Sequence, residues 1–390
     1  MRLGIDAVNI RDYGGLTHLS QLLTVADPEA FDFESVTVWG NERILDLLPH
    51  RSWLIKRSAP WMDGPLPQRI IGHQVWLPVA LKSRGCDVIF SPGGSLPREC
   101  GIPTVTMSQN MLPFESDRAQ LFGRFNRMTL KMWLLRTAQG QTFSRADGII
   151  FLTDYALDVV GRVVRMQGAQ TTKIPHGVES RFFMRPREQR SSNAISEANP
   201  LRLLYVSQQW PYKHHIELLN ALEILRRRGI PVELQMAGNN STAYGKLVRQ
   251  ERQKIDPSGS FIKDLGHVEF SQLHLLYQQA DVFVFPSSCE NLPISLIEAM
   301  AAGLPIACSR GGPMPEILGD AGRYFNPEVV STIVDAVVEL VENESLRAKL
   351  AQNAWSKAQA YSWEGCAEQT FCFLAQIARG GYHNGKRLHV

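Results

Sequence analysis

The sequence lacks the features that mark secreted, membrane-spanning or disulfide-rich proteins. Its six cysteines are scattered over 390 residues without a Cys-x-x-Cys pair, so we expect reduced thiols and no zinc finger. No apolar run approaches the ~18 residues of a membrane span. The opening Met1-Arg2-Leu3-Gly4-Ile5-Asp6 leaves no room for a signal peptide. We therefore expect a cytoplasmic protein, soluble or peripheral on the inner face of the plasma membrane.

Strong charge of one sign is also missing. Lys and Arg number 41 against 38 Asp and Glu, a formal net charge of +3, which gives no reason to expect nucleic acid as a partner. The hydrophobic content of 44% is that of an ordinary globular protein. At roughly 100 to 200 residues per domain, the chain is long enough for two or three domains.

Several catalytic and metal-binding patterns are absent as well. The sequence holds no D-x-D, H-x-x-x-H or G-x-S-x-G, and no G-x-G-x-x-G follows the apolar runs 3–7 or 201–206. We therefore expect no metal site, no cofactor and no serine nucleophile, and a dinucleotide-dependent dehydrogenase is disfavoured.

What is present is a regular alternation of short apolar runs with helical patterns, which predicts an α/β protein with parallel sheets. The predicted strands are 3–7, 33–38, 88–90, 104–106, 148–152, 201–207, 232–237, 282–285 and 305–308. The predicted helices of the second half are 216–228, 271–280, 293–302 and 330–341. The polar segment 185–200 has proline near both ends and no periodicity, so we expect a linker between two Rossmann-like domains facing across a cleft.

The segment from Phe285 to Pro305 carries the densest chemical signal. A strand ends, a loop holds Glu290, and a helix begins near Pro293 and stops at Gly303. The free N–H groups at this helix start, from about Asn291 through Leu292 to Ser295, form an anion site.

Glu298 lies inside the same helix, where a carboxylate can accept two hydrogen bonds from the vicinal diol of a ribose. An anion site beside a diol acceptor describes a nucleotide diphosphate. Two glutamates eight positions apart also occur on ordinary surface helices. The apolar neighbours of Glu298 favour a buried carboxylate that needs a partner.

This part of the sequence resembles the retaining glycosyltransferases of family 4, which have the GT-B fold. The E-x7-E motif of that family is present as Glu290 and Glu298, followed by a close match to E-A-M-A-x-G-x-P. Further matching segments are Gly311-Gly312, Pro315-Glu316, Asp320-Ala321-Gly322, Phe325-Asn326-Pro327 and Pro175-His176-Gly177-Val178.

The resemblance implies an acceptor-binding domain over 1–185 and a nucleotide-sugar-binding domain over 200–360. Within 361–390, a helix from about 363 to 378 would pack back on the first domain. Glu290 would lie beside the donor sugar, Glu298 would hold the ribose and Lys213 would contact the diphosphate. The donor site would also include Gln208, Asn291, Leu292, Pro293 and the glycine loop Gly14-Gly15. Gly14-Gly15 could equally be a plain turn.

Two positions depart from the family pattern. The chain has Ser207-Gln208 where the family often has Gly-Arg, and Gln109-Asn110 where it often has His-Asp. We take Asn110 and His18 as candidates on the acceptor side.

The implied function is metal-independent, retaining transfer of a hexose-type sugar from a GDP- or UDP-linked donor to a hydroxyl of a glycan or lipid-linked glycan, in bacterial surface polysaccharide assembly. Two alternatives stay open. One is a nucleotide-sugar 2-epimerase of the same architecture, and the other is a nucleotide-sugar-binding protein without turnover.

One basic segment of the first half adds another expectation. From Arg118 to Arg136 the chain has five cations, no acid and many apolar residues, the composition of an amphipathic helix that binds an anionic membrane surface. A core-packed helix with a basic edge would have the same composition.

Overall fold

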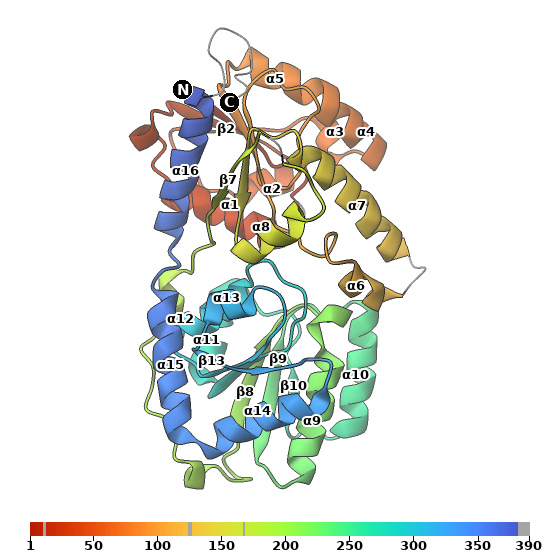
Figure 1. Cartoon of the computed structure of the whole chain (residues 1–390), viewed down its shortest axis with the longest axis vertical. Coiled ribbons are helices and arrows are strands. Elements are labelled where there is room, and N and C mark those ends of the chain that lie inside the picture. The colour runs from red at the N-terminus through yellow and green to blue at the C-terminus, as the bar shows by residue number, and fades with distance from the viewer. Residues whose placement is uncertain (11–12, 124–126, 167, 381–390) are drawn as a thin grey trace. The chain divides into compact units, whose positions relative to one another are not determined.

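The computed structural model describes residues 1–10, 13–123, 127–166 and 168–380 and divides them into two compact units (Figure 1). The first unit contains Met1–Glu115, Arg127–Gly177 and the described chain from Ser362 on. The second contains residues 116–123 and Val178–Tyr361. The first unit is therefore built from the N-terminal and the C-terminal parts of the described chain.

The first unit is built on a seven-stranded parallel sheet in the order β3-β2-β1-β4-β5-β6-β7. Its central strands are fully buried, since helices cover both faces of such a sheet. The strands are β1 (Arg2–Asp6), β2 (Ser35–Trp39), β3 (Leu54–Arg57), β4 (Val88–Ser91), β5 (Thr104–Met107), β6 (Gly148–Phe151) and β7 (Gln170–Lys173).

The helices of the first unit include one from the far end of the sequence. Helix α16 (Trp363–Gly380) packs against α1, β4 and β5, and Phe373 and Ile377 lie so close to Gly148 that a Cβ there would meet them at 2.9 and 3.1 Å. The other helices are α1 (Tyr13–Val25), α2 (Glu42–Asp46), α3 (Pro60–Asp63), α4 (Leu66–Ile71), α5 (Leu77–Ser83), α7 (Arg127–Phe143) and α8 (Asp154–Gly161).

The second unit has a six-stranded parallel sheet in the order β10-β9-β8-β11-β12-β13. Its strands are β8 (Leu201–Val206), β9 (Val232–Ala237), β10 (Ile262–Asp264), β11 (Val282–Phe285), β12 (Ile306–Ser309) and β13 (Gly322–Phe325). Its helices are α6 (Ser116–Ala119), α9 (His215–Arg227), α10 (Ala243–Ile255), α11 (Phe270–Gln279), α12 (Ile294–Ala301), α13 (Met314–Leu318), α14 (Val330–Glu342) and α15 (Glu344–Ala358).

The predicted α/β class, the buried strands and the four helices of the second half are confirmed, with boundaries within one or two residues. Four strands were not predicted, namely β3, β7, β10 and β13.

The expected single helix over Arg118–Arg136 is wrong. After α6 the chain forms a short 3-10 helix, Gln120–Phe122, which ends at Gly123 with a φ of 110°, a conformation that breaks a helix. Residues 124–126 lie outside the described part of the chain, and α7 begins at Arg127 in the other unit. The basic segment is thus divided between α6 with the 3-10 helix in one unit and α7 in the other.

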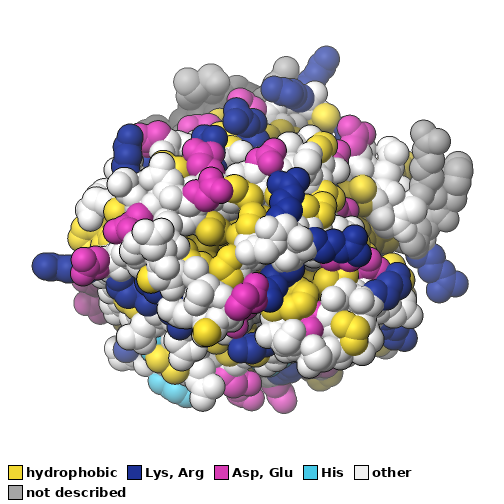
Figure 2. Space-filling view, turned by 90° about the horizontal axis from the view of Figure 1, so that it is seen from below, with side chains coloured by type: hydrophobic (Ala, Val, Ile, Leu, Met, Phe, Trp, Pro, Cys, Tyr) yellow, Lys and Arg dark blue, Asp and Glu magenta, His cyan; other side chains and the backbone are white. Residues whose placement is uncertain are grey.

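No helix of the described residues is long and apolar enough to cross a membrane. On the face viewed in Figure 2, Lys and Arg side chains lie between hydrophobic and acidic ones. The positive charge on that face therefore forms small groups and no continuous patch.

Candidate functional site

Two loops of the second unit meet where the strand order of its sheet reverses. β8 ends at Val206 and its neighbour β11 ends at Phe285, and ligands of such sheets bind outside the carboxyl ends of the strands at this point. The N–H of Ser288 donates to the carbonyl of Tyr212 over 2.9 Å, which joins the two loops. The Lys213 and Glu290 regions of the sequence are thereby brought together.

The ammonium of Lys213 forms an ion pair with a carboxylate oxygen of Glu290. Lys213 ends a 3-10 helix, Pro211–Lys213, and His214 follows in the left-handed conformation at φ 52° before α9 begins. The ammonium also lies 5.4 Å from the Tyr212 ring centre and 5.9 Å from that of Phe285. With exposures of only 14% and 12%, the two side chains form a largely buried pair.

Helix α12 begins directly after this pair. Pro293 is its N-cap, and the first turn holds no acidic residue. Asn291 and Leu292 are each 6% exposed in the loop that leads into it. The unpaired N–H groups of a helix start and the helix dipole both favour an anion at this end.

Glu298 is a buried acid on the same helix, with 3% exposure. Burial raises the pKa of its carboxyl to about 7, although the Tyr277 hydroxyl, which donates to it over 2.8 Å, acts in the opposite direction. The carboxylate of Glu179 raises this pKa further, and the guanidinium of Arg181 lowers it. A carboxyl group with such a pKa changes charge near neutral pH.

Gln208 lies on the exposed part of the loop after β8. Its amide oxygen accepts a hydrogen bond from the indole N–H of Trp210 over 3.1 Å. This loop runs so close to Gly238 that a Cβ there would lie 2.0 Å from the Ser207 carbonyl oxygen. His215 supplies no charge to the loop at neutral pH, because burial lowers its pKa to about 3.

The remaining predicted site residues lie in the first unit. Gly14 and Gly15 are in the first turn of α1, and a Cβ at Gly14 would meet no atom within 4 Å. Asn110 is exposed after β5, and its side-chain oxygen accepts from the N–H of Leu112 over 3.1 Å. The packing of the described residues therefore leaves space beside Gly14.

His18 is fully buried on α1. Its Nδ1 lies 2.9 Å from Nδ1 of His176, and the rings of His18 and Trp363 are 5.8 Å apart. Burial lowers the pKa of His18 to about 4, so the ring is neutral at physiological pH. In the structure His18 helps to join α1, His176 and the start of α16.

A buried ion pair lies at the carboxyl end of β1, outside the predicted site residues. Asp6 accepts from His73 over 2.7 Å and from the Ser91 hydroxyl over 3.3 Å. Burial disfavours the charged imidazole, but the Asp6 carboxylate outweighs it and raises the pKa of His73. The position of Asp6 at the carboxyl end of a buried strand was a signal, whereas nothing in the sequence pointed to His73, which lies in a π-helical turn, Gly72–Trp76.

No group of three or more His, Cys, Asp or Glu in the described ranges is arranged to hold a metal ion.

The fold is shared with solved glycosyltransferase structures along almost the whole chain. Sucrose-phosphate synthase from Thermosynechococcus elongatus superposes with a TM-score of 0.73 at 16% identity, over 97% of this chain and 99% of that one. HepE of Anabaena in complex with UDP-glucose gives a TM-score of 0.67 at 16% identity, over 97% and 98% of the two chains. The protein thus has the GT-B fold of two Rossmann-like units, as predicted.

The second unit matches a known family. Residues 187–357 match the sequence model of Glycosyl transferases group 1. A relative, the O-antigen chain mannosyltransferase B of Escherichia coli, is 30% identical over 176 residues, which are 43% of this chain and 44% of the relative. The chain spans about half the length of the first curated relatives that it matches.

Proposed function

We propose that the protein is a retaining glycosyltransferase of family 4 that transfers a hexose-type sugar from a GDP- or UDP-linked donor to a hydroxyl of a glycan or lipid-linked glycan. Surface polysaccharide assembly in a bacterium is the proposed context. The observation that carries the proposal is the Lys213–Glu290 ion pair beside the start of α12. The names of two similar proteins support it, since one is an O-antigen mannosyltransferase and the other was solved with UDP-glucose.

In this proposal the donor diphosphate binds at the start of α12. Its negative charge is balanced by the helix N-terminus and by the ammonium of Lys213, while Glu298 accepts hydrogen bonds from the ribose hydroxyls. Glu290 lies beside the sugar and holds the Lys213 ammonium in place before the donor arrives.

The chemical step follows from the same arrangement. As the bond between sugar and diphosphate breaks, charge grows on the diphosphate, and groups that are already oriented stabilise it at no reorganisation cost. The leaving phosphate oxygen takes the proton of the attacking acceptor hydroxyl on the same face of the sugar, so that the configuration is retained. Because Lys213 and the α12 N-terminus supply positive charge, we propose that this step needs no metal ion.

Incubation with GDP- and UDP-hexoses and a lipid-linked glycan tests the proposal. Transfer of sugar with an unchanged anomeric configuration, read by mass spectrometry and NMR, is expected for the wild type and for the surface control Glu251→Gln on α10. Glu290→Gln should lower the rate strongly. An epimerised donor or free glycal would instead identify the 2-epimerase, and tight donor binding without any product would identify a binding protein.

We further propose that the acceptor is reached at an anionic membrane surface through α7. This helix and the chain up to Ala146 contain no acidic residue. Leu130, Trp133 and Leu134 are 59%, 61% and 53% exposed on α7, and Arg127 and Lys131 are exposed beside them. Exposed apolar side chains with flanking cations match the chemistry of anionic lipid headgroups above an acyl layer.

A second exposed stretch of the first unit supports the same proposal. From Gly64 to Cys86 the chain again lacks acids. Along α4, the π-helical turn and α5 it exposes Leu66, Ile70, Ile71, Val75, Trp76 and Val79 by 40 to 65%. Apolar side chains exposed in such a group indicate a binding surface.

A further inference from the structure

A cavity with four arginines lies at the opposite end of the two strands that lead to the candidate donor site. It occupies about 220 Å³ and is lined by Arg187, Arg190, Arg202 and Arg347 against two acids, Asp281 and Glu188. Arg202 is near the start of β8 and Asp281 directly precedes β11. The cavity is therefore at the amino ends of these strands, whereas Lys213 and Glu290 follow their carboxyl ends.

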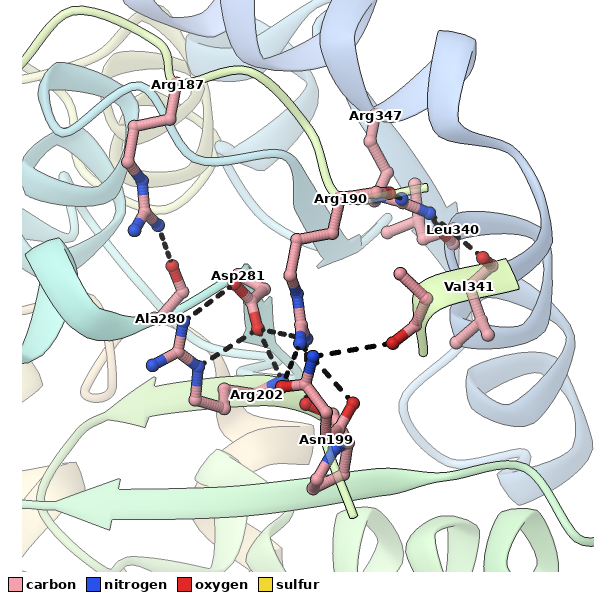
Figure 3. A network of polar contacts seen from close by, with 11 residues as sticks. Arg187, Arg190, Asn199, Arg202, Ala280, Asp281, Leu340, Val341 and Arg347 are labelled. Atoms are coloured by element: carbon pink, nitrogen blue, oxygen red, sulfur yellow. Dashed lines mark hydrogen bonds and ion pairs between the residues drawn. The ribbon is translucent and has the colours of Figure 1, made fainter. Parts of the chain in front are cut away.

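Asp281 is paired with two of the arginines, as Figure 3 shows. Its oxygens accept from Nη2 of Arg190 at 2.7 Å, and from Nε, Nη2 and the backbone N–H of Arg202 at 3.1, 3.2 and 2.9 Å. Its single negative charge is shared by the guanidiniums of Arg190 and Arg202, so it cannot also balance the charge of a third.

Arg187 is that third guanidinium. It donates to the carbonyl of Ala280, a neutral partner, and no carboxylate among the described residues pairs with it. Although part of its surface is exposed, burial of the rest lowers the pKa of Arg187, and the guanidiniums of Arg202 and Arg190 lower it further against the effect of Asp281. The cavity therefore keeps an uncompensated positive charge.

Arg190 adds an unsatisfied donor. Its Nε is buried and has no hydrogen-bond partner in the described part of the chain, while its other nitrogens bind Asn199, Pro200 and Asp281. A buried polar atom without a partner is uncommon, and a bound ion or water is a usual explanation. Arg190 and Arg187 both line the same cavity.

Arg347 binds backbone carbonyls and no carboxylate of the cavity lining. It is 1% exposed, and its guanidinium donates to the carbonyls of Leu340 and Val341 at the end of α14 and to the backbone carbonyl of Arg190. The Ser192 hydroxyl also donates to the Val341 carbonyl, at 3.0 Å. These contacts fix most of the predicted linker, 185–200, onto the second unit.

We propose that this cavity binds a small, multiply charged phosphate anion, such as a phosphate monoester or pyrophosphate, at a site separate from the candidate donor site. Guanidinium groups bind phosphate oxygens through paired, charge-assisted hydrogen bonds. Arg187 and Arg202 contact the anion, Arg190 adds its positive charge to the lining, and Arg347 is a positioning residue. The volume of the cavity limits the bound group to a small anion.

Pyrophosphate titrations by calorimetry test the site, with Lys213→Ala as the background so that the candidate donor site is weakened. In this background we expect one pyrophosphate to bind. Adding Arg187→Gln should weaken it about tenfold or more, the loss of one charge-assisted contact, and Arg187→Lys should restore part of the affinity. Arg185→Gln is the matched control, because Arg185 is exposed two residues away and does not line the cavity.

Arg187→Gln leaves the Asp281 network intact, so the variant should fold, and equal melting temperatures of the Arg187→Gln and Arg185→Gln proteins would verify this. Equal pyrophosphate affinity of the two variants would overturn the proposal. Loss of all binding on Lys213→Ala alone would do the same, because the anion would then be at the donor site.

Discussion

Lys213 and Glu290 form an ion pair although 77 residues separate them in the sequence. Each residue follows one of two neighbouring parallel strands, β8 and β11. The parallel sheet therefore brings one charge of each sign to the same edge, beside the start of α12. Because each charge already has its partner, the pair is arranged before any ligand is bound.

Lys213→Ala should mainly reduce turnover, on the order of 10²-fold or more, because the charge on the diphosphate grows in the transition state. Steady-state kinetics with the donor checks this, and Lys254→Ala on the surface of α10 serves as control. If only the Michaelis constant changes, Lys213 merely anchors the donor.

Glu298→Gln keeps the shape of the side chain and removes its charge. A charge-assisted hydrogen bond contributes about 1.5 to 3 kcal/mol, so donor affinity should fall roughly 10- to 100-fold while the protein stays folded. Calorimetry measures the affinity, and circular dichroism checks the fold. An unchanged dissociation constant would show that Glu298 does not bind the ribose.

Donor affinity should also depend on pH in the wild type. The folded protein raises the pKa of Glu298 to about 7, so the carboxyl group is largely protonated at pH 6 and largely ionised at pH 8. If the ionised form accepts the ribose hydroxyls, affinity rises as the pH increases through 7. Glu298→Gln should abolish this dependence. Tyr277→Phe should move it to higher pH, because the hydroxyl that stabilises the carboxylate is lost.

Gln208→Arg should tighten nucleotide diphosphate binding by about 1 to 2 kcal/mol if its side chain reaches the phosphates, since a guanidinium donates stronger bonds than an amide. A rival source of charge is a neighbouring histidine, which would tighten binding in the wild type as the pH falls through about 6.5. His215 is excluded from this role by its pKa of about 3. Nucleotide affinities of wild type and Gln208→Arg at pH 6 and pH 8 distinguish the two explanations. If neither the pH nor the substitution alters the affinity, the loop that holds Gln208 does not contact the phosphates.

Binding to anionic vesicles should weaken with salt and with the pair Arg127→Glu and Lys131→Glu on α7, because each cation near such a surface contributes about 1 kcal/mol. The pair Arg162→Glu and Arg165→Glu changes the same charge on exposed residues of the same unit and should have little effect. Co-sedimentation measures both pairs. Equal sedimentation with neutral and anionic vesicles would rule out this use of α7.

The strands that sequence analysis missed have one feature in common. β3 and β7 are the edges of the first sheet, and β10 and β13 are the edges of the second. An edge strand has one neighbour and is partly exposed, so its sequence carries polar residues, as Gln170–Lys173 does. The central strands were predictable because both of their faces are buried.

The candidate site, like the fold, was predictable only in part. Glu290, Asn291 and Pro293 could be placed at a helix start from local sequence, since proline and glycine mark its limits. Two other contacts could not be predicted from local sequence, because each joins residues from separate elements. They are the hydrogen bond from the Tyr277 hydroxyl to Glu298 and the ion pair between Asp6 and His73. The linker prediction for 185–200 failed for the same reason, since its arginines are held by partners far along the chain.

The position of α16 also sets the order in which the protein can be completed during synthesis. The second unit is finished once Tyr361 has left the ribosome. The first unit has most of its sheet by residue 173, but the surface of β4, β5 and Gly148 stays uncovered until Phe373 and Ile377 emerge. The first unit, most of which is translated first, is therefore the last to complete its fold. A nascent chain halted before α16 would present this apolar surface to chaperones.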